Sequence, residues 1–144
     1  MTPVDLSKLE LMPTFPGLNV QFPFHSATGT AASAVVYFEV DPGMFLPTHT
    51  DSAEEILVVL AGEGEAWIGD DTVHIVEGQM ALVPAMAPHG VRNTGDEVLR
   101  VVGFFAGSTV VSTFPETPDG PQVFVIGGPM PIAMPLEQPS TVAV

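Results

Sequence analysis

The 144-residue chain contains no cysteine, which excludes disulfides, thiolate metal sites and cysteine nucleophiles. Basic residues are nearly absent as well. Only Lys8, Arg92 and Arg100 oppose 17 acidic residues, and the net charge is −14. Such a chain repels phosphate backbones and anionic membrane surfaces. We therefore expect neither a nucleic acid nor a membrane as a partner.

Long apolar segments are also missing. No apolar run approaches the ~18 residues that a transmembrane helix needs. The stretch 1–15 lacks the cationic start and apolar run of a signal peptide. The expected location is therefore the cytoplasm. The length and the 46% hydrophobic content are those of one globular domain.

Short apolar and β-branched segments alternate with turn residues, at intervals of about 8–12 residues. The expected strands cover 18–24, 31–40, 45–49, 55–61, 65–68, 72–76, 80–83, 89–93, 97–106, 108–114 and 122–126. One helical turn is expected over Asp5–Leu9. This rhythm predicts an all-β sandwich or barrel in one domain, 1–144. Its core covers about 18–114, and a proline-rich extension with one short strand covers 115–144.

Two stretches carry the residues that point to chemistry. The first has Gly43, His49, Asp51, Glu55 and Gly62, separated by five, one, three and six residues. The second has Gly78, Pro84, Met86, His89 and Asn93, separated by five, one, two and three residues. Two imidazoles with carboxylates are a ligand set typical of a mononuclear iron, manganese, nickel or zinc site. Since residues i and i+2 of a strand point to one face, His49 and Asp51 can both point inward.

These paired spacings resemble the two motifs of the cupin family, G-x5-H-x-H-x3,4-E-x6-G and G-x5-P-x-G-x2-H-x3-N. The resemblance implies an antiparallel jelly-roll barrel, which in this family is commonly a dimer, so a homodimer is expected. It also implies that His49, Glu55 and His89 are ligands of one divalent transition metal ion. The sequence departs from the family pattern at Asp51, where the family has histidine, and at Met86, where it has glycine.

The role of Asp51 is open to three interpretations. As a fourth ligand, it completes a set of two histidines and two carboxylates that favours Fe²⁺ or Mn²⁺ over copper, with nickel or zinc as alternatives. If it does not bind, two histidines and one carboxylate leave open positions for O₂ or substrate. It could also act as a general base beside the substrate. We expect three firm ligands, with Asp51 as a weaker fourth.

Strand parity with the ligands predicts the pocket wall, which consists of Phe45, Leu57, Val59, Met86 and Val91. This apolar set suits a small apolar or aromatic enol or carbonyl substrate better than a sugar. The leading hypothesis is a dioxygenase-type oxidoreductase with Asp51 and Glu55 as catalytic residues. The alternatives are a redox-neutral isomerase or lyase, and a non-enzymatic barrel that binds a small molecule.

Overall fold

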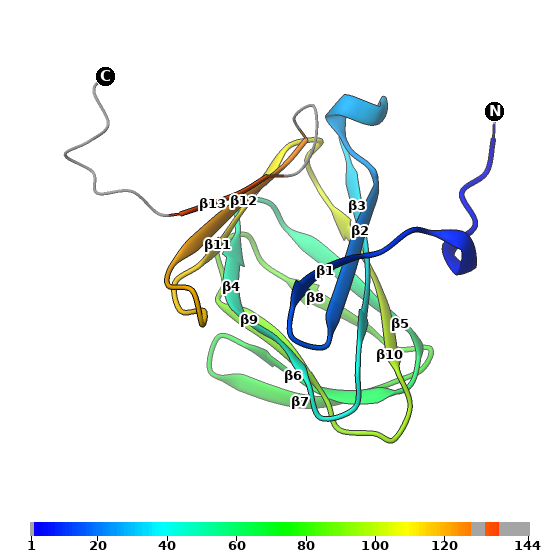
Figure 1. The fold of residues 1–144 in the computed structure, drawn as a ribbon, viewed down its shortest axis with the longest axis vertical. Helices are drawn as coiled ribbons and strands as arrows, with labels where there is room; N and C mark the ends of the chain where they lie inside the picture. The colour runs from blue at the N-terminus through cyan, green and yellow to red at the C-terminus, as the bar shows by residue number, and fades with distance from the viewer. Residues whose placement is uncertain (1, 128–131, 136–144) are drawn as a thin grey trace.

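The computed structural model describes residues 2–127 and 132–135, and these residues are almost entirely β structure (Figure 1). The strands are β1 (Met12–Phe15), β2 (Leu18–Phe24), β3 (Ala34–Val40), β4 (Phe45–Asp51), β5 (Glu55–Ala61), β6 (Glu63–Ile68), β7 (Asp71–Val76), β8 (Met80–Val83), β9 (His89–Asn93), β10 (Leu99–Phe105), β11 (Val110–Phe114), β12 (Gln122–Ile126) and β13 (Ile132–Pro135). Two short 3-10 helices, η1 (Leu6–Lys8) and η2 (Ser26–Thr28), complete the described elements. No helix in the described part of the chain is long and apolar enough to cross a membrane.

The strands form two antiparallel sheets that face each other (Figure 1). The first sheet has the order β1-β2-β3-β10-β5-β8, and the second has the order β13-β12-β11-β4-β9-β6-β7. Neighbours in each sheet are often far apart in sequence, as with β3 and β10 or β4 and β11. This arrangement confirms the antiparallel jelly-roll barrel predicted from the sequence.

The core lies between the two sheets and is built by the period-2 alternation of the strands. In β5, Glu55, Leu57 and Val59 point inward and are buried, whereas Ile56 points outward and is 39% exposed. Residues from β2, β3 and β10 add Leu18, Val36, Phe38, Val101 and Phe105 to the same core. The buried side chains of the described strands are mostly apolar, and the polar ones are His49, Asp51, Glu55, His89, Asn93 and Ser112.

Strand β4 differs from the expected strand in length and regularity. It continues to Asp51, two residues beyond the expected end at His49. Its pairing with β9 shifts register between Leu46 and His49, which indicates a bulge or irregularity. Pro47, His49 and Asp51 are buried, but Phe45 on the other side of this shift is exposed. The register shift therefore ends the alternation on which the expected pocket wall was based.

The two ends of the chain hold strands that were not expected. β1 was missed because Pro13 and the nearby Pro16 and Gly17 indicate breaks. It forms because an edge strand tolerates proline, whose missing N–H needs no partner there. The helical turn expected over Asp5–Leu9 is present as η1, and β12 has the expected bounds. β13 was also not expected, and the rest of the extension, 128–131 and 136–144, lies outside the described residues.

Candidate metal centre

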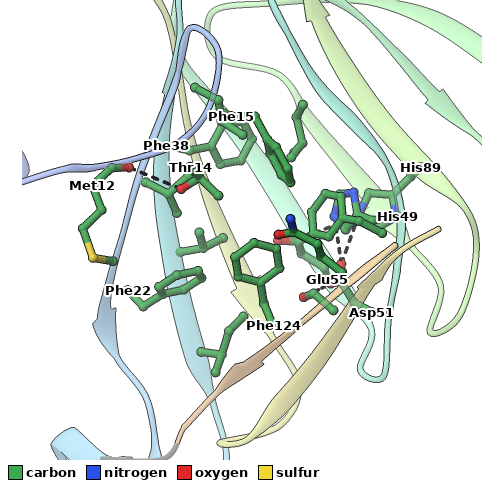
Figure 2. A pocket seen from close by; sticks show the side chains of 18 of the residues that line it. Met12, Thr14, Phe15, Phe22, Phe38, His49, Asp51, Glu55, His89 and Phe124 are labelled. Carbon is green, nitrogen blue, oxygen red and sulfur yellow. Dashed lines mark hydrogen bonds and ion pairs between the residues drawn. The ribbon is translucent and has the colours of Figure 1, made fainter. Parts of the chain in front are cut away.

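Four polar side chains from three strands meet between the sheets (Figure 2). His49 and Asp51 come from β4, and His89, the first residue of β9, pairs directly with His49. Glu55, the first residue of β5, comes from the opposite sheet. All four are buried, with exposed fractions of 6%, 2%, 2% and 3% for His49, Asp51, His89 and Glu55.

Asp51 lies in the middle of this cluster. Its Oδ2 atom is 3.5 Å from Nε2 of His49 and 3.1 Å from Nε2 of His89. Oε1 of Glu55 lies 3.4 Å from the same Nε2 of His89. One donor atom each from His49, Asp51 and His89 lies within 4.8 Å of the other two. The expectation made Glu55 a firm ligand and Asp51 the weaker fourth, but the structure gives Asp51 the central position.

The backbone orients both imidazole rings. Nδ1 of His49 lies 2.9 Å from the carbonyl oxygen of Pro47, and Nδ1 of His89 lies 2.9 Å from that of Ala87. Each Nδ1 therefore carries a hydrogen that it donates to the carbonyl. In the neutral ring this leaves Nε2 with a free lone pair directed toward Asp51, which is the arrangement that metal-binding histidines use.

The two carboxylates are held by contacts with residues that sequence analysis did not single out. Oγ of Ser112, on β11, donates a hydrogen bond of 2.5 Å to Oδ1 of Asp51. Gly103, on β10, lies against Glu55 so closely that a Cβ atom there would be 2.2 Å from its Oε2. Serine leaves Oδ2 of Asp51 directed at the histidines, and glycine leaves the space that the Glu55 carboxylate occupies.

The electrostatics of the cluster favour an ion pair between Asp51 and His89. Burial opposes ionisation of Asp51, but contacts with His49 and His89 outweigh it and hold the pKa of Asp51 below its usual range. Burial likewise opposes a charged His89, yet its contacts with Asp51 and Glu55 raise the pKa of His89 to about 10. Burial raises the pKa of Glu55, and the negative charge of Asp51 adds to this effect. In the metal-free protein at neutral pH, His89 therefore remains protonated.

The donor set fits a divalent metal ion on two observations. Donor atoms that bind one ion at about 2.0–2.2 Å lie roughly 2.8–3.6 Å from each other, and Oδ2 of Asp51 lies 3.5 Å from Nε2 of His49 and 3.1 Å from Nε2 of His89. In addition, Oδ2 of Asp51 and Nε2 of His89 are buried without a hydrogen bond of good geometry, although they face each other. Buried polar atoms without such a bond are costly unless a ligand satisfies them. The group His49–Asp51–His89 could thus hold a metal ion.

A cavity of about 270 Å³ opens onto the cluster. Figure 2 shows the histidines and carboxylates at one end and Met12 and Phe22 at the other. The wall consists of Met12, Pro13, Thr14, Phe15, Leu18, Val20, Phe22, Val36, Phe38, Leu46, His49, Asp51, Glu55, Leu57, His89, Phe105, Ser112, Phe114, Gln122, Phe124 and Ile126. Most of it is aliphatic or aromatic, so the cluster is the polar end of an otherwise apolar chamber.

The wall differs from the one expected from strand parity. Of the five expected residues only Leu57 lines the cavity, while Val59 and Val91 are buried in the core beside it. Phe45 is 41% exposed because the register shift in β4 directs Leu46 inward in its place. Met86 is 60% exposed, in the loop before β9.

Residues from the ends of the chain supply wall positions that sequence analysis missed. The rings of Phe15, Phe114 and Phe124 form a cluster with centroids 5.1, 5.4 and 6.0 Å apart. The Phe114 ring stacks on His49, with centroids 4.5 Å apart and an interplanar angle of 12°. Alternation within 110–114 was the available signal for Phe114, since Val110, Ser112 and Phe114 are all buried. No comparable signal exists for Phe15, which lies in a stretch that indicates breaks.

The remaining two histidines lie elsewhere. His25 is buried as the N-cap of η2, where its ring accepts a hydrogen bond from the backbone of Ala27. His74, on β7, is largely exposed and lies 3.2 Å from a carboxylate oxygen of Glu63. Neither residue lines the cavity.

Comparisons with known proteins agree with this architecture. The family model described as "Cupin domain" matches residues 36–105, which include both motifs. No curated protein matches the sequence. Among solved structures, an oxalate decarboxylase from Lactobacillus farciminis in complex with formate superposes with a TM-score of 0.67 at 19% identity, over 74% of this chain and 33% of that one. The present chain thus spans about a third of the oxalate decarboxylase.

Two smaller proteins align over most of their length. The polyketide cyclase RemF from Streptomyces resistomycificus has a TM-score of 0.64 and 21% identity, with 73% of this chain and 78% of that one covered. The cupin domain of Cnp3 from Schizosaccharomyces pombe has a TM-score of 0.61 and 18% identity, with 73% of both chains covered. At these identities the likeness concerns the fold alone.

Proposed function

Because the chain belongs to the cupin superfamily, with the family's domain at residues 36–105, we propose that it is a metal-dependent oxidoreductase of dioxygenase type. Its substrate is a small apolar or aromatic compound with an enol or carbonyl group, and O₂ is the co-substrate. The observation that carries this proposal is the position of the His49–Asp51–His89 group at the inner end of an apolar cavity. A molecule bound there has its hydrocarbon part against the wall and its oxygen atoms at the polar end.

The expected ion is iron or manganese, with nickel or zinc as alternatives. The two imidazoles and two carboxylates form a donor set with hard oxygen ligands, which suits Fe²⁺ and Mn²⁺. When bound, the ion supplies Lewis acidity and, for iron or manganese, the redox chemistry that activation of O₂ requires. His49, Asp51 and His89 would hold it, and Glu55, which lies 3.4 Å from Nε2 of His89 and comes from the opposite sheet, would be beside them.

The chain's own residues carry the rest of the chemistry. The apolar wall excludes water from the polar end of the cavity. Glu55, whose pKa is raised by burial, can hold or release a proton next to the substrate oxygen. Asp51, held ionised by its contacts with the two histidines, remains an acceptor at the same place.

The test is metal analysis followed by oxygen uptake. Protein purified without added metal should contain iron or manganese, and O₂ consumption should appear with a member of a panel of β-diketones, catechols and flavonol-like compounds. His49→Ala and His89→Ala should each remove the metal while far-UV circular dichroism remains that of a β protein. His74→Ala is the matched control because this histidine is exposed. Less than about 0.1 equivalent of any transition metal contradicts the proposal.

A redox-neutral isomerase or lyase is the second candidate, and the two adjacent buried carboxyl groups favour it. Glu55 and Asp51 have pKa values displaced in opposite directions, so one can donate a proton while the other accepts one. Turnover or deuterium exchange from D₂O under anaerobic conditions separates this candidate from a dioxygenase. Saturable binding with no turnover in either assay supports the non-enzymatic barrel.

A further inference from the structure

The cavity wall beyond the metal centre offers almost no polar groups. Apart from the cluster and Ser112, the only described residues with polar side chains in the wall are Thr14 and Gln122. The Thr14 hydroxyl already donates a hydrogen bond of 3.3 Å to the carbonyl of Met12 (Figure 2). The Ser112 hydroxyl already donates its hydrogen bond to Asp51. A ligand that fills this chamber therefore meets hydrocarbon over most of its surface.

Outside the metal centre, no cationic side chain of the described residues reaches the cavity, and these residues include the three lysine and arginine residues of the chain. Lys8 is exposed and pairs with Asp5 at 3.7 Å. The Arg92 guanidinium lies 4.8 Å from the centroid of the Phe45 ring, which is itself outside the cavity. Arg100 donates a hydrogen bond of 2.7 Å to the Tyr37 hydroxyl, on a part of the first sheet that does not line the chamber.

The wall therefore lacks the partner that a negatively charged ligand requires. An ionised carboxylate taken out of water needs a cation or several hydrogen-bond donors, and a hydrocarbon wall supplies neither. The charge of −14 on the whole chain acts in the same direction at long range.

The aromatic side chains give the chamber flat surfaces. Phe114 extends from the His49 ring as a parallel plate, and Phe15 and Phe124 meet Phe114 at 51° and 75°. Aromatic ligands gain from stacked and edge-on contacts with such walls. The volume of about 270 Å³ is about nine times that of a water molecule in the liquid, which suits one substituted ring.

We infer that this cavity selects an uncharged, single-ring aromatic ligand and rejects the same ligand when it carries a carboxylate away from the metal. The inference rests on the proposed function only in using the metal centre as the anchor for the ligand's oxygen atoms.

A matched pair of ligands tests the inference without any turnover. 4-Methylcatechol and 3,4-dihydroxybenzoate share the ring and the two hydroxyl groups, and they differ by a methyl group in place of a carboxylate. Calorimetric titration of the protein as purified, under anaerobic conditions, should give at least about 100-fold tighter binding of 4-methylcatechol. The preference should persist at 0.5 M NaCl, where long-range repulsion is screened.

A variant that adds a cationic side chain to the wall tests whether the missing cation causes the preference for the uncharged ligand. Phe22 lies at the end of the cavity away from the histidines (Figure 2). Phe22→Lys should bind 3,4-dihydroxybenzoate at least about tenfold more tightly than Phe22→Met. The methionine side chain is nearly as long as that of lysine but carries no charge. Circular dichroism and thermal unfolding of both variants check that each is folded.

The outcomes distinguish this inference from the proposed function. Equal binding of the two ligands, preference for the carboxylate, loss of the preference at high salt or binding of neither overturns the inference, whatever the oxygen-uptake assay gives. Selective binding of 4-methylcatechol without oxygen uptake by any compound supports the inference and contradicts the dioxygenase proposal.

Discussion

Ser112 donates a hydrogen bond of 2.5 Å to Oδ1 of Asp51, and both side chains are buried. This contact joins β11 to β4 and fixes the carboxylate so that its other oxygen faces the two histidines. Ser112 lies outside the residues that match the cupin domain. The segment after the family's domain thus helps to shape the centre.

Ser112→Ala tests this contact. Removing the hydroxyl frees the Asp51 carboxylate to rotate, and outer hydrogen-bond partners of this kind change metal affinity by about 10–100-fold. We expect at least tenfold weaker metal binding by titration calorimetry and about 1–3 kcal/mol lower free energy of unfolding without metal. Thr113→Ala, on the same strand but only half-buried, is the control and should change neither. Unchanged affinity in Ser112→Ala contradicts the assigned role.

The sequence predicted the architecture because turn residues and alternation are local signals. Glycine, proline and Asp/Asn clusters predicted most strand ends to within a few residues of their positions in the structure. The two motifs identified His49, Asp51, Glu55 and His89 as the residues of the candidate centre. The contact of Ser112 with Asp51 could not be predicted, since the two residues are separated by 61 positions. It depends on the pairing of β4 with β11, which neither segment encodes by itself.

The cavity wall was predicted poorly for a different reason. Strand parity assigns residues to a face only while the pairing stays regular. The register shift between Leu46 and His49 reverses which residues point inward on its two sides. Pro47 lies within this shift, and a proline inside a strand fits either an edge strand or a bulge, so the sequence alone does not specify the shift. Phe15 lies in a stretch where proline obscured the strand pattern, and Phe124 lies in a predicted strand whose pairing with β11 the sequence does not specify.

Gly103→Ala tests whether the Glu55 position depends on the missing side chain. An alanine Cβ would lie 2.2 Å from Oε2 of Glu55 and 2.8 Å from Cγ1 of Val36, so these groups must move. We expect a loss of about 1–3 kcal/mol in the free energy of unfolding and weaker metal binding, measured by denaturant titration and calorimetry. Gly107→Ala is the control, since its Cβ meets nothing closer than 3.6 Å. Equal stability of the two variants contradicts the prediction.

Met86 occupies the position at which the family pattern has glycine, and the structure shows the physical reason for that preference. Its φ angle is 65°, in the left-handed region that favours glycine. Its backbone N–H donates a hydrogen bond of 2.8 Å to the carbonyl of Asp51, which ties the loop before His89 to β4. The loop therefore keeps the conformation that glycine usually provides.

Met86→Gly should consequently stabilise the protein. The left-handed conformation costs about 1–2 kcal/mol for a non-glycine residue, and the greater freedom of glycine in the unfolded chain offsets about 0.5–1 kcal/mol of that gain. We expect the free energy of unfolding to rise by up to about 1 kcal/mol in denaturant titrations. Met80→Gly, at a 68% exposed strand position, should lower it. A destabilised Met86→Gly variant would show that the methionine side chain makes a contact that outweighs the strain.

The outer face of the first sheet predicts a homodimer. Phe104 pairs with Ile56 and Ile56 pairs with Leu82 across three strands, and these side chains are 46%, 39% and 57% exposed. An exposed apolar surface of this kind is typical of an interface. The charged residues placed on this face by strand alternation are Arg100 and Glu39, which are opposite in sign and 3.9 Å apart. A second copy can approach this face without the repulsion that a charge of −14 causes elsewhere.

Sedimentation velocity measures this association. The wild-type protein should sediment as a dimer at micromolar concentration, and Phe104→Glu should sediment as a monomer. Val73→Glu, at a 49% exposed position of β7 in the other sheet, should remain a dimer. A monomeric wild-type protein, or dissociation in the Val73 variant alone, contradicts the prediction.

The pKa of about 10 for His89 predicts strongly pH-dependent metal binding. At neutral pH the metal-free protein holds a proton on His89, and the metal must displace it to reach Nε2. Apparent affinity should therefore rise about tenfold for each pH unit up to about pH 10, and one proton should be released per metal bound. The ion pair also stabilises the metal-free fold below the ordinary histidine pKa of 6.5. That stabilisation is lost as pH rises through about 10, so chelated protein should unfold more easily at pH 9.5 than at pH 6. Zinc titrations from pH 6.5 to 9 in buffers of different ionisation enthalpy measure both the affinity and the released proton. An affinity that is constant between pH 7.5 and 9 would show that His89 is already neutral and that Asp51 does not hold its proton.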